Sequence, residues 1–283
     1  MATIVASADP ITSYQTEGYC LVKGLFSKDE AKFFLEHYME LRKQPRGGDL
    51  AYETAATSND PLTQYPRMIN MHEWDEVSMK FLLDQRLKKI LMDMAGSEPY
   101  AVQTMIYYKP AGARGQALHQ DQFYLKVEPG TCIAAWLALE PIDEENGCMS
   151  VVPGSQNLPI LCTIKSDTTQ SFTDVTVPLS SEMRAVPVVM EPGDVLFFNG
   201  SMIHGSGPNV SKDRFRRSLI AHYATGDAQK LGTFYKAIDF EGNRVGLEAN
   251  PGGSKCGQWV DQAGNPILEL VDKQEHDKRD LRD

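Results

Sequence analysis

The sequence predicts a mainly β fold of the jelly-roll or barrel type, preceded by α-helices. After residue 98 the chain changes to short runs of aromatic, β-branched and apolar residues, which Gly and Pro interrupt. Eight such runs follow one another with no helical periodicity between them, and this favours a jelly roll over alternating β-α-β units. The runs span residues 100–108, 117–125, 131–139, 147–152, 185–190, 194–199, 202–205 and 216–223.

The first 98 residues are expected to hold two helices and one short strand. A capping box formed by Ser27 and Glu30 starts the first helix, and Gly96 ends the second. Both helical stretches have apolar residues at helical spacing. The predicted elements are a strand at 18–24 and helices over 28–42 and 75–94, with a loose leader over 1–14 and a long loop over 45–66.

Two later segments lack periodicity. Residues 155–184 are polar, and a loop of that length in a compact domain is usually functional. The tail from residue 242 ends in a charged run and is expected to be solvated and partly disordered. We therefore predict a single domain over 1–283, with a helical part (1–98), a β core (99–225) that contains the 155–184 insert, and a C-terminal extension (226–283).

Composition is that of a globular protein, with 42% hydrophobic and 23% charged residues. The net charge of -10 and the lack of a basic cluster disfavour partners such as nucleic acid or an anionic membrane. The N-terminus does not resemble a signal peptide, and no apolar run is long enough to span a membrane. Five scattered cysteines without a C-x-x-C pair predict reduced thiols in a cytoplasmic protein: Cys20, Cys132, Cys148, Cys162 and Cys256.

A candidate metal site starts in residues 118–124 (LHQDQFY), which are expected to form a strand. On a strand, residues two apart share a face, so His119 and Asp121 would project together, with Phe123 next in the row. An H-x-D pair alone is more often chance than a site. With His204 as a third ligand, the set becomes the facial triad of non-haem Fe(II) oxygenases. Zinc hydrolysis would need fewer open metal positions and a poised base.

A second pattern lies on the predicted strand at 216–223. The period of two places Arg216, Ser218 and His222 on one face. A guanidinium beside a hydroxyl suits a carboxylate, because the fork binds both oxygens at once. Arg217 fits a surface position better, and His222 is expected to be a buried, hydrogen-bonded core residue. The other histidines are expected away from the site: His37, His72 and His276.

Three segments resemble a known family. QTMIYYKPAGARGQALHQDQFYL, AAWLALEPIDEENGCMSVVPGSQ and EPGDVLFFNGSMIHGSGPN followed by FRRSLIAHY resemble the phytanoyl-CoA dioxygenase (PhyH) family of Fe(II)/2-oxoglutarate-dependent oxygenases. The order H-x-D, E-N-G-C, V-P-G-S, P-G-D, H-G-S, R-x-S is specific. The resemblance covers residues 99–153 and 188–223, and neither the 155–184 loop nor the tail after residue 223 contributes to it.

The resemblance implies a double-stranded β-helix, a jelly roll of cupin-like architecture with N-terminal helices. It implies iron held by His119, Asp121 and His204, dioxygen as oxidant, and 2-oxoglutarate whose distal carboxylate binds Arg216 and Ser218. The His204–Arg216 spacing is one residue longer than in several relatives, which leaves Arg217 as an alternative clamp. Further contacts are expected to the cosubstrate from Gln103, Tyr107 and Trp136, and to the substrate from Phe123 and Arg67.

The implied reaction is hydroxylation or another oxidation of an unactivated C–H bond in a small organic molecule, such as a specialised metabolite, with release of succinate and CO2. Relatives that halogenate carry a small residue in place of the carboxylate ligand, so Asp121 favours hydroxylation. Desaturation, ring closure and epimerisation stay open. So do two other classes of protein: a cupin-type metalloenzyme that does not use 2-oxoglutarate, and a non-catalytic binding protein on the same scaffold.

Overall fold

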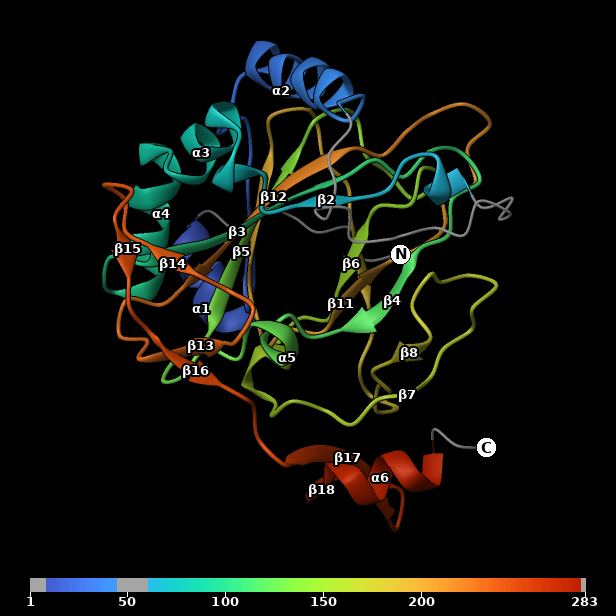
Figure 1. Cartoon of the computed structure of the whole chain (residues 1–283). Coiled ribbons are helices and arrows are strands. Elements are labelled where there is room, and N and C mark those ends of the chain that lie inside the picture. Colours follow the sequence, from blue (N-terminus) through green and yellow to red (C-terminus); the bar gives the residue numbers. More distant parts are fainter. Residues whose placement is uncertain (1–8, 45–60, 281–283) are drawn as a thin grey trace.

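Two β-sheets pack face to face in the computed structural model, which describes residues 9–44 and 61–280 (Figure 1). The larger sheet has the strand order β1 (Tyr19–Val22), β10 (Val195–Asn199), β5 (Cys132–Ala138), β12 (Ser218–Ala224), β3 (Tyr100–Tyr107), β14 (Ala237–Ile238) and β15 (Arg244–Val245), and β2 (Met68–Ile69) also pairs with β3. The smaller sheet has the order β4 (Gln116–His119), β11 (His204–Ser206), β6 (Met149–Val151) and β9 (Val186–Val188).

Apolar side chains of both sheets form one core between them. Trp136 and Ile220 from the larger sheet share a buried cluster with Met149, Val151 and Val188 from the smaller sheet. All pairings within these two sheets are antiparallel. The mainly β, jelly-roll fold predicted from the sequence is confirmed.

Helices cover the other face of the larger sheet (Figure 1). Phe34 and Leu91 from two of these helices lie in a second buried cluster with Ile133, Leu137 and Leu219 from the sheet. The helices are α1 (Pro10–Glu17), α2 (Lys28–Leu41), α3 (Glu76–Leu82) and α4 (Gln85–Ala95). The capping box of α2 is present, with the Ser27 hydroxyl accepting from the backbone N–H of Glu30.

Two expectations about the helical part are corrected. The helix predicted over 75–94 is two helices, because the Asp84 carboxylate accepts from the Arg86 backbone N–H and caps a new helix there. α1 begins within the expected loose leader, where Asp9 caps it and Pro10 is its first residue, and it continues to Glu17. The loop predicted over 45–66 falls largely on residues 45–60, outside the described part of the chain.

The strand predicted over 117–125 ends early. β4 stops at His119, and Asp121 has helical dihedrals (φ -63°, ψ -31°) and begins the short helix α5 (Gln122–Leu125). The Asp121 carbonyl accepts from the backbone N–H groups of Tyr124 and Leu125. The alternation argument that placed His119, Asp121 and Phe123 in one row is therefore wrong beyond His119.

The tail expected to be partly disordered is structured over most of its length. It holds β16 (Glu248–Asn250), which pairs with β13 (Lys230–Gly232), the hairpin of β17 (Lys255–Gln262) and β18 (Asn265–Asp272), and α6 (Lys273–Asp280). The 155–184 insert contains a small pairing of β7 (Ile164–Lys165) with β8 (Val175–Thr176). Short 3-10 helices lie at Pro61–Thr63, Met71–Glu73 and Ser155–Asn157.

A disulfide fastens the β17–β18 hairpin to the 155–184 insert. It joins Cys162 to Cys256, which are 94 residues apart. The expectation of reduced thiols is wrong for this pair, because no local spacing signals a bond across that distance. Trp259 Nε1 donates to the Pro178 carbonyl at 3.0 Å on the same interface. His276, which belongs to the tail expected to be solvated, is buried there with Nε2 2.8 Å from the Thr163 carbonyl.

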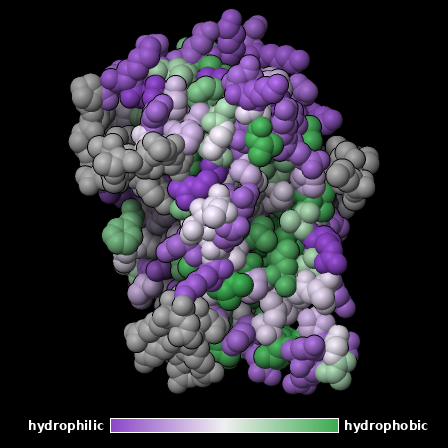
Figure 2. Space-filling model, turned by 90° about the vertical axis from the view of Figure 1, so that its right-hand side faces the viewer, coloured by the Kyte–Doolittle hydropathy of each residue, from purple (hydrophilic) through white to green (hydrophobic). Residues whose placement is uncertain are grey.

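No helix in the described ranges is long and apolar enough to cross a membrane. Figure 2 shows the side of the molecule that lies at the right of Figure 1, where hydrophilic side chains cover the upper part and hydrophobic ones gather in the lower half. The cytoplasmic location and the single-domain organisation stay predictions.

Removing the disulfide should loosen the β17–β18 hairpin. In the double variant Cys162→Ser/Cys256→Ser, the free energy of unfolding should fall by about 2–4 kcal/mol, because the unfolded chain loses a long covalent loop. The amides of β17 should exchange faster with solvent, as hydrogen–deuterium exchange can measure. Cys20→Ser, which also replaces a buried sulfur, should leave that exchange unchanged. Five titratable thiols in the unreduced, denatured protein, in place of three, would contradict the bond.

Candidate metal centre

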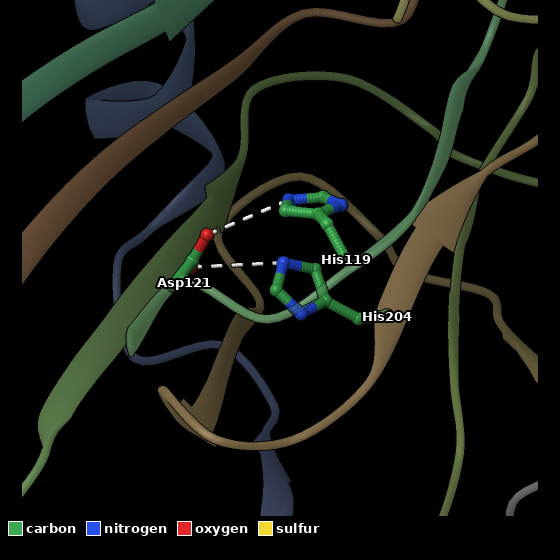
Figure 3. A group of neighbouring side chains, drawn as sticks. All are labelled: His119, Asp121 and His204. Atoms are coloured by element: carbon green, nitrogen blue, oxygen red, sulfur yellow. Dashed lines mark ion pairs between the residues drawn. The ribbon is translucent and has the colours of Figure 1, made fainter. Parts of the chain in front are cut away.

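Two histidines meet across the pairing of β4 with β11. His119 and His204 are register partners, and their ring centroids lie 4.2 Å apart. Gly205 permits this approach, because a Cβ there would lie 2.8 Å from the Gln116 carbonyl oxygen. Asp121 completes the group from the start of α5, with its carboxylate oxygens 3.5 Å from His119 Nε2 and 3.6 Å from His204 Nε2 (Figure 3).

Backbone hydrogen bonds orient both imidazoles. His119 Nδ1 lies 2.9 Å from the Ala117 carbonyl, and His204 Nδ1 lies 3.0 Å from the Met202 carbonyl. A carbonyl only accepts, so Nδ1 carries the proton in each ring and Nε2 presents its lone pair toward Asp121. Metal-binding histidines commonly have this arrangement, in which the outer nitrogen donates to a carbonyl.

The charges suit a divalent cation. Burial alone would raise the pKa of Asp121, but the imidazoles of His204, His119 and His222 lower it well below its ordinary value. Burial and the neighbouring His119 lower the pKa of His204 to about 4. At neutral pH Asp121 is therefore a carboxylate and the His204 imidazole is neutral, the protonation states that bind metal.

The donor set fits iron(II). The ligand atoms of His119, Asp121 and His204 all lie within 4.8 Å of one another, and among the described residues no other such group of three forms. Two nitrogens and one carboxylate on one side of an ion leave the opposite positions open, as in the non-haem Fe(II) oxygenases. The sequence prediction of these three ligands agrees with this geometry, although Asp121 reaches the site from a helix start and not from a strand.

Arg216 is buried in the lining of the same cavity as the metal ligands. It is 4% exposed, and its Nη1 donates to the Ser218 hydroxyl at 3.0 Å, as the predicted pairing of these residues requires. Its Nε donates to the Gly147 carbonyl at 3.2 Å. Arg217 points the other way and forms a two-point ion pair with Glu140. The cavity lining therefore includes Arg216 and not Arg217.

A second buried cation, Lys109, was not predicted. Its Nζ donates to the Gly147 carbonyl, the Ser206 hydroxyl and the Gly207 carbonyl, and it shares the first of these with Arg216. Burial and the Arg216 charge lower the pKa of Lys109 well below its ordinary value, and burial lowers the pKa of Arg216 to about 10. The sequence signal was the alternation along β3, which continues from Tyr107 to Lys109.

The three metal ligands, Arg216 and Lys109 line one cavity of about 230 Å³, whereas Ser218 is fully buried behind the lining and reaches the cavity only through its contact with Arg216. The predicted contacts Gln103, Tyr107, Trp136 and Arg67 all border it, and Arg67 Nη1 donates to the Tyr107 hydroxyl at 2.8 Å. The Arg216 guanidinium carbon lies 5.2 Å from the Trp136 ring centre. Sequence reasoning missed further lining residues. Three of them lie in the first family segment at positions that no motif specifies, Arg114, Gln116 and Tyr124, and three lie outside the family segments, Leu62, Phe172 and Tyr235.

Phe123 does not border this cavity. Because α5 begins at Gln122, the Phe123 ring turns away from the metal ligands toward two neighbouring hollows and lies under Lys273, whose Nζ is 4.1 Å from the ring centre. The expectation that Phe123 shares a row with His119 and Asp121 is not met. The next residue, Tyr124, borders the cavity in its place.

The sequence profile described as Phytanoyl-CoA dioxygenase (PhyH) matches residues 14–218, which is most of the chain. The chain belongs to the phytanoyl-CoA dioxygenase family. It is 27% identical over 256 residues to the peroxisomal phytanoyl-CoA dioxygenase of Bos taurus, covering 84% of this chain and 75% of that protein. It is 26% identical over 248 residues to the multifunctional dioxygenase prhA of Penicillium brasilianum, covering 82% and 77%.

Solved structures share the fold. EctD from S. alaskensis with 2-oxoglutarate and 5-hydroxyectoine superimposes with a TM-score of 0.63 at 22% identity, covering 87% of this chain and 84% of that one. The epimerase SnoN in complex with Fe3+, alpha ketoglutarate and nogalamycin RO gives a TM-score of 0.60 at 21% identity, covering 78% and 84%. Family membership and the triad together establish an Fe(II)/2-oxoglutarate-dependent dioxygenase.

Loss of either histidine ligand should remove metal binding without unfolding the protein. Each of His119→Ala and His204→Ala leaves two ligands, so Co(II) affinity should fall by more than the roughly 10–100-fold typical of losing an outer hydrogen bond. Calorimetric titration of the metal-free protein measures this. His37→Gln, which alters a histidine paired with Asp75 instead, should bind Co(II) like the wild type. Unchanged affinity in either alanine variant would contradict the assignment.

Proposed function

We propose that this enzyme hydroxylates an unactivated C–H bond of a small organic molecule, with 2-oxoglutarate held by Arg216 and Ser218. The observation that carries the proposal is the pair of buried cations beside an open His-Asp-His triad in the same cavity. Neither Arg216 nor Lys109 forms an ion pair with a carboxylate of the described residues. Two charges buried in this way call for an anionic ligand.

The protein's part in the reaction is to place two molecules beside the metal. Bound iron and 2-oxoglutarate would supply oxidation by dioxygen, with release of succinate and CO2. Arg216 and Ser218 would take the distal carboxylate of 2-oxoglutarate, and Lys109 would add a second positive charge and hold the shared carbonyl and hydroxyl groups in place. Trp136 and Tyr107 would form walls beside that carboxylate.

The side chains around the rest of the cavity favour a small substrate that has an apolar part, which can pack against aromatic rings, and polar groups. Tyr124 and Phe172 provide rings, and Arg67 and the Tyr107 hydroxyl provide hydrogen bonds. The volume lies below the roughly 300–1,000 Å³ of pockets for drug-sized ligands, which supports a compact molecule. EctD was solved with the small molecule 5-hydroxyectoine, in keeping with a small-molecule substrate.

Asp121 supports oxygen transfer over halogenation. A buried carboxylate held among three imidazoles occupies the position that a halide would need on the metal. A cupin-type enzyme that does not use 2-oxoglutarate would leave Arg216 and Lys109 buried without an anion, which is costly. The proposal therefore accounts for more of the site than that alternative does.

Arg216→Ala should abolish tight 2-oxoglutarate binding. Truncating one partner of a buried, hydrogen-bonded charge pair costs about 2–5 kcal/mol, or roughly 30-fold or more in affinity. Anaerobic titration of the Fe(II)-loaded protein, followed through the visible metal-to-ligand band, measures the dissociation constant.

Arg217→Ala is the matched control for this titration. It removes a neighbouring guanidinium whose partner is Glu140 on the far side of the strand, so 2-oxoglutarate affinity should stay at the wild-type value. A wild type without the band, or equal affinity in wild type and Arg216→Ala, would show that 2-oxoglutarate does not bind here.

Succinate release tests the reaction class. With iron, ascorbate, 2-oxoglutarate and air, a panel of small metabolites should contain compounds that raise succinate formation above the uncoupled rate, with product mass increased by one oxygen. Asp121→Ala should lose this stimulation because a metal ligand is missing. If a stimulating compound instead loses two hydrogens, the reaction is desaturation and the assignment of hydroxylation is wrong.

A further inference from the structure

A third imidazole contacts the metal-binding carboxylate and is not one of the three ligands. His222 lies on β12 in the larger sheet, is 4% exposed, and borders the same cavity. Its Nε2 is 3.1 Å from Asp121 Oδ2, closer than the nearest nitrogen of either His119 or His204. The ligand atoms that gather within 4.8 Å of one another do not include any from His222.

The hydrogen bond fixes which ring nitrogen carries the proton. An ionised carboxylate only accepts, so Nε2 of His222 must donate to Asp121. Within the described residues, Nδ1 of His222 is buried and has no hydrogen-bond partner. Unpaired buried polar atoms are uncommon because they are costly. The one hydrogen bond of this ring, to Asp121, is therefore the interaction that accounts for a buried histidine at this position.

The place of Asp121 in the chain explains why such a donor is needed. Asp121 stands just after β4 ends, and its carboxylate does not cap α5. Backbone carbonyls orient the other two ligands, whereas among the described residues the polar contacts of the Asp121 carboxylate are with imidazoles. Two of those imidazoles would turn their Nε2 lone pairs to a metal, which leaves His222 as the donor to the carboxylate.

We propose that His222 is a positioning residue that holds the Asp121 carboxylate in its metal-binding orientation across the gap between the two sheets. The inference rests on the proposed metal centre. It makes β12 supply two functions along one face: Ser218 at the cosubstrate end and His222 at the metal end, four residues apart. His222 is expected to act through Asp121 and not as a metal ligand.

Metal affinity without cosubstrate tests this role. Co(II) is titrated into the metal-free protein by calorimetry, with circular dichroism to check folding. His222→Leu should weaken Co(II) binding roughly 10–100-fold, as loss of a hydrogen bond to a ligand typically does. His222→Gln, whose side-chain amide nitrogen can take the place of Nε2, should recover most of that loss. His222→Asn, whose amide is too short to reach Asp121, should stay weak.

His72→Leu is the matched control. His72 is also buried, and its ring Nδ1 lies 3.0 Å from the hydroxyl oxygen of Thr104. Thr104 follows Gln103 on β3, so its side chain points to the face of the sheet opposite the cavity. The control should bind Co(II) like the wild type. The visible absorption bands of bound Co(II) should change in His222→Leu and return in His222→Gln, which a purely structural role for His222 would not produce.

Equal Co(II) affinity in wild type and His222→Leu would overturn the inference, as would a glutamine variant as weak as the leucine variant. If His222→Leu does not fold, the comparison of His222→Gln with His222→Asn decides in the same way. A wild type that fails to bind Co(II) would instead contradict the metal centre and with it the proposed function. No 2-oxoglutarate is present, so an error in the cosubstrate assignment leaves the result untouched.

Discussion

The pairing of β4 with β11 is the constraint on which the site depends. Antiparallel pairing puts His119 opposite His204, residues 85 positions apart in the sequence, and carbonyl groups two residues before each histidine orient both rings. The cation-binding geometry is therefore a property of the backbone register. A register slip of one residue would turn one ring to the opposite face of the smaller sheet, so strand pairing and metal binding cannot vary independently.

The larger sheet supplies the rest of the site along one face. Gln103 and Tyr107 on β3, Trp136 on β5 and Arg216 just before β12 all border the cavity. Burying Arg216 and Lys109 side by side is unfavourable for the isolated protein, because both lose hydration and repel each other. An anion that binds between them would compensate both the lost hydration and the repulsion. Part of the affinity for such a ligand is thus set when the sheets close.

Sequence patterns predicted the parts of the site that follow local rules. Alternation placed Gln103, Tyr107 and Arg216 on the cavity side and paired Arg216 with Ser218, and the capping box located α2. Alternation failed at Asp121, because the chain leaves the strand there and no residue type marks that change. The disulfide and the His222 contact join segments 94 and 101 residues apart. Such distant contacts depend on the packing of whole sheets, which a single sequence does not display.

The fastening of the C-terminal hairpin has a bearing on how the protein can be handled. The insert that carries Cys162 also provides Phe172 and Thr173 to the cavity wall, and the hairpin that carries Cys256 lies against it. A fusion or affinity tag placed after α6 would thus pull on the hairpin, which the disulfide joins covalently to the insert that forms part of the cavity wall. A tag at the other terminus would act on α1, across the larger sheet from the metal ligands.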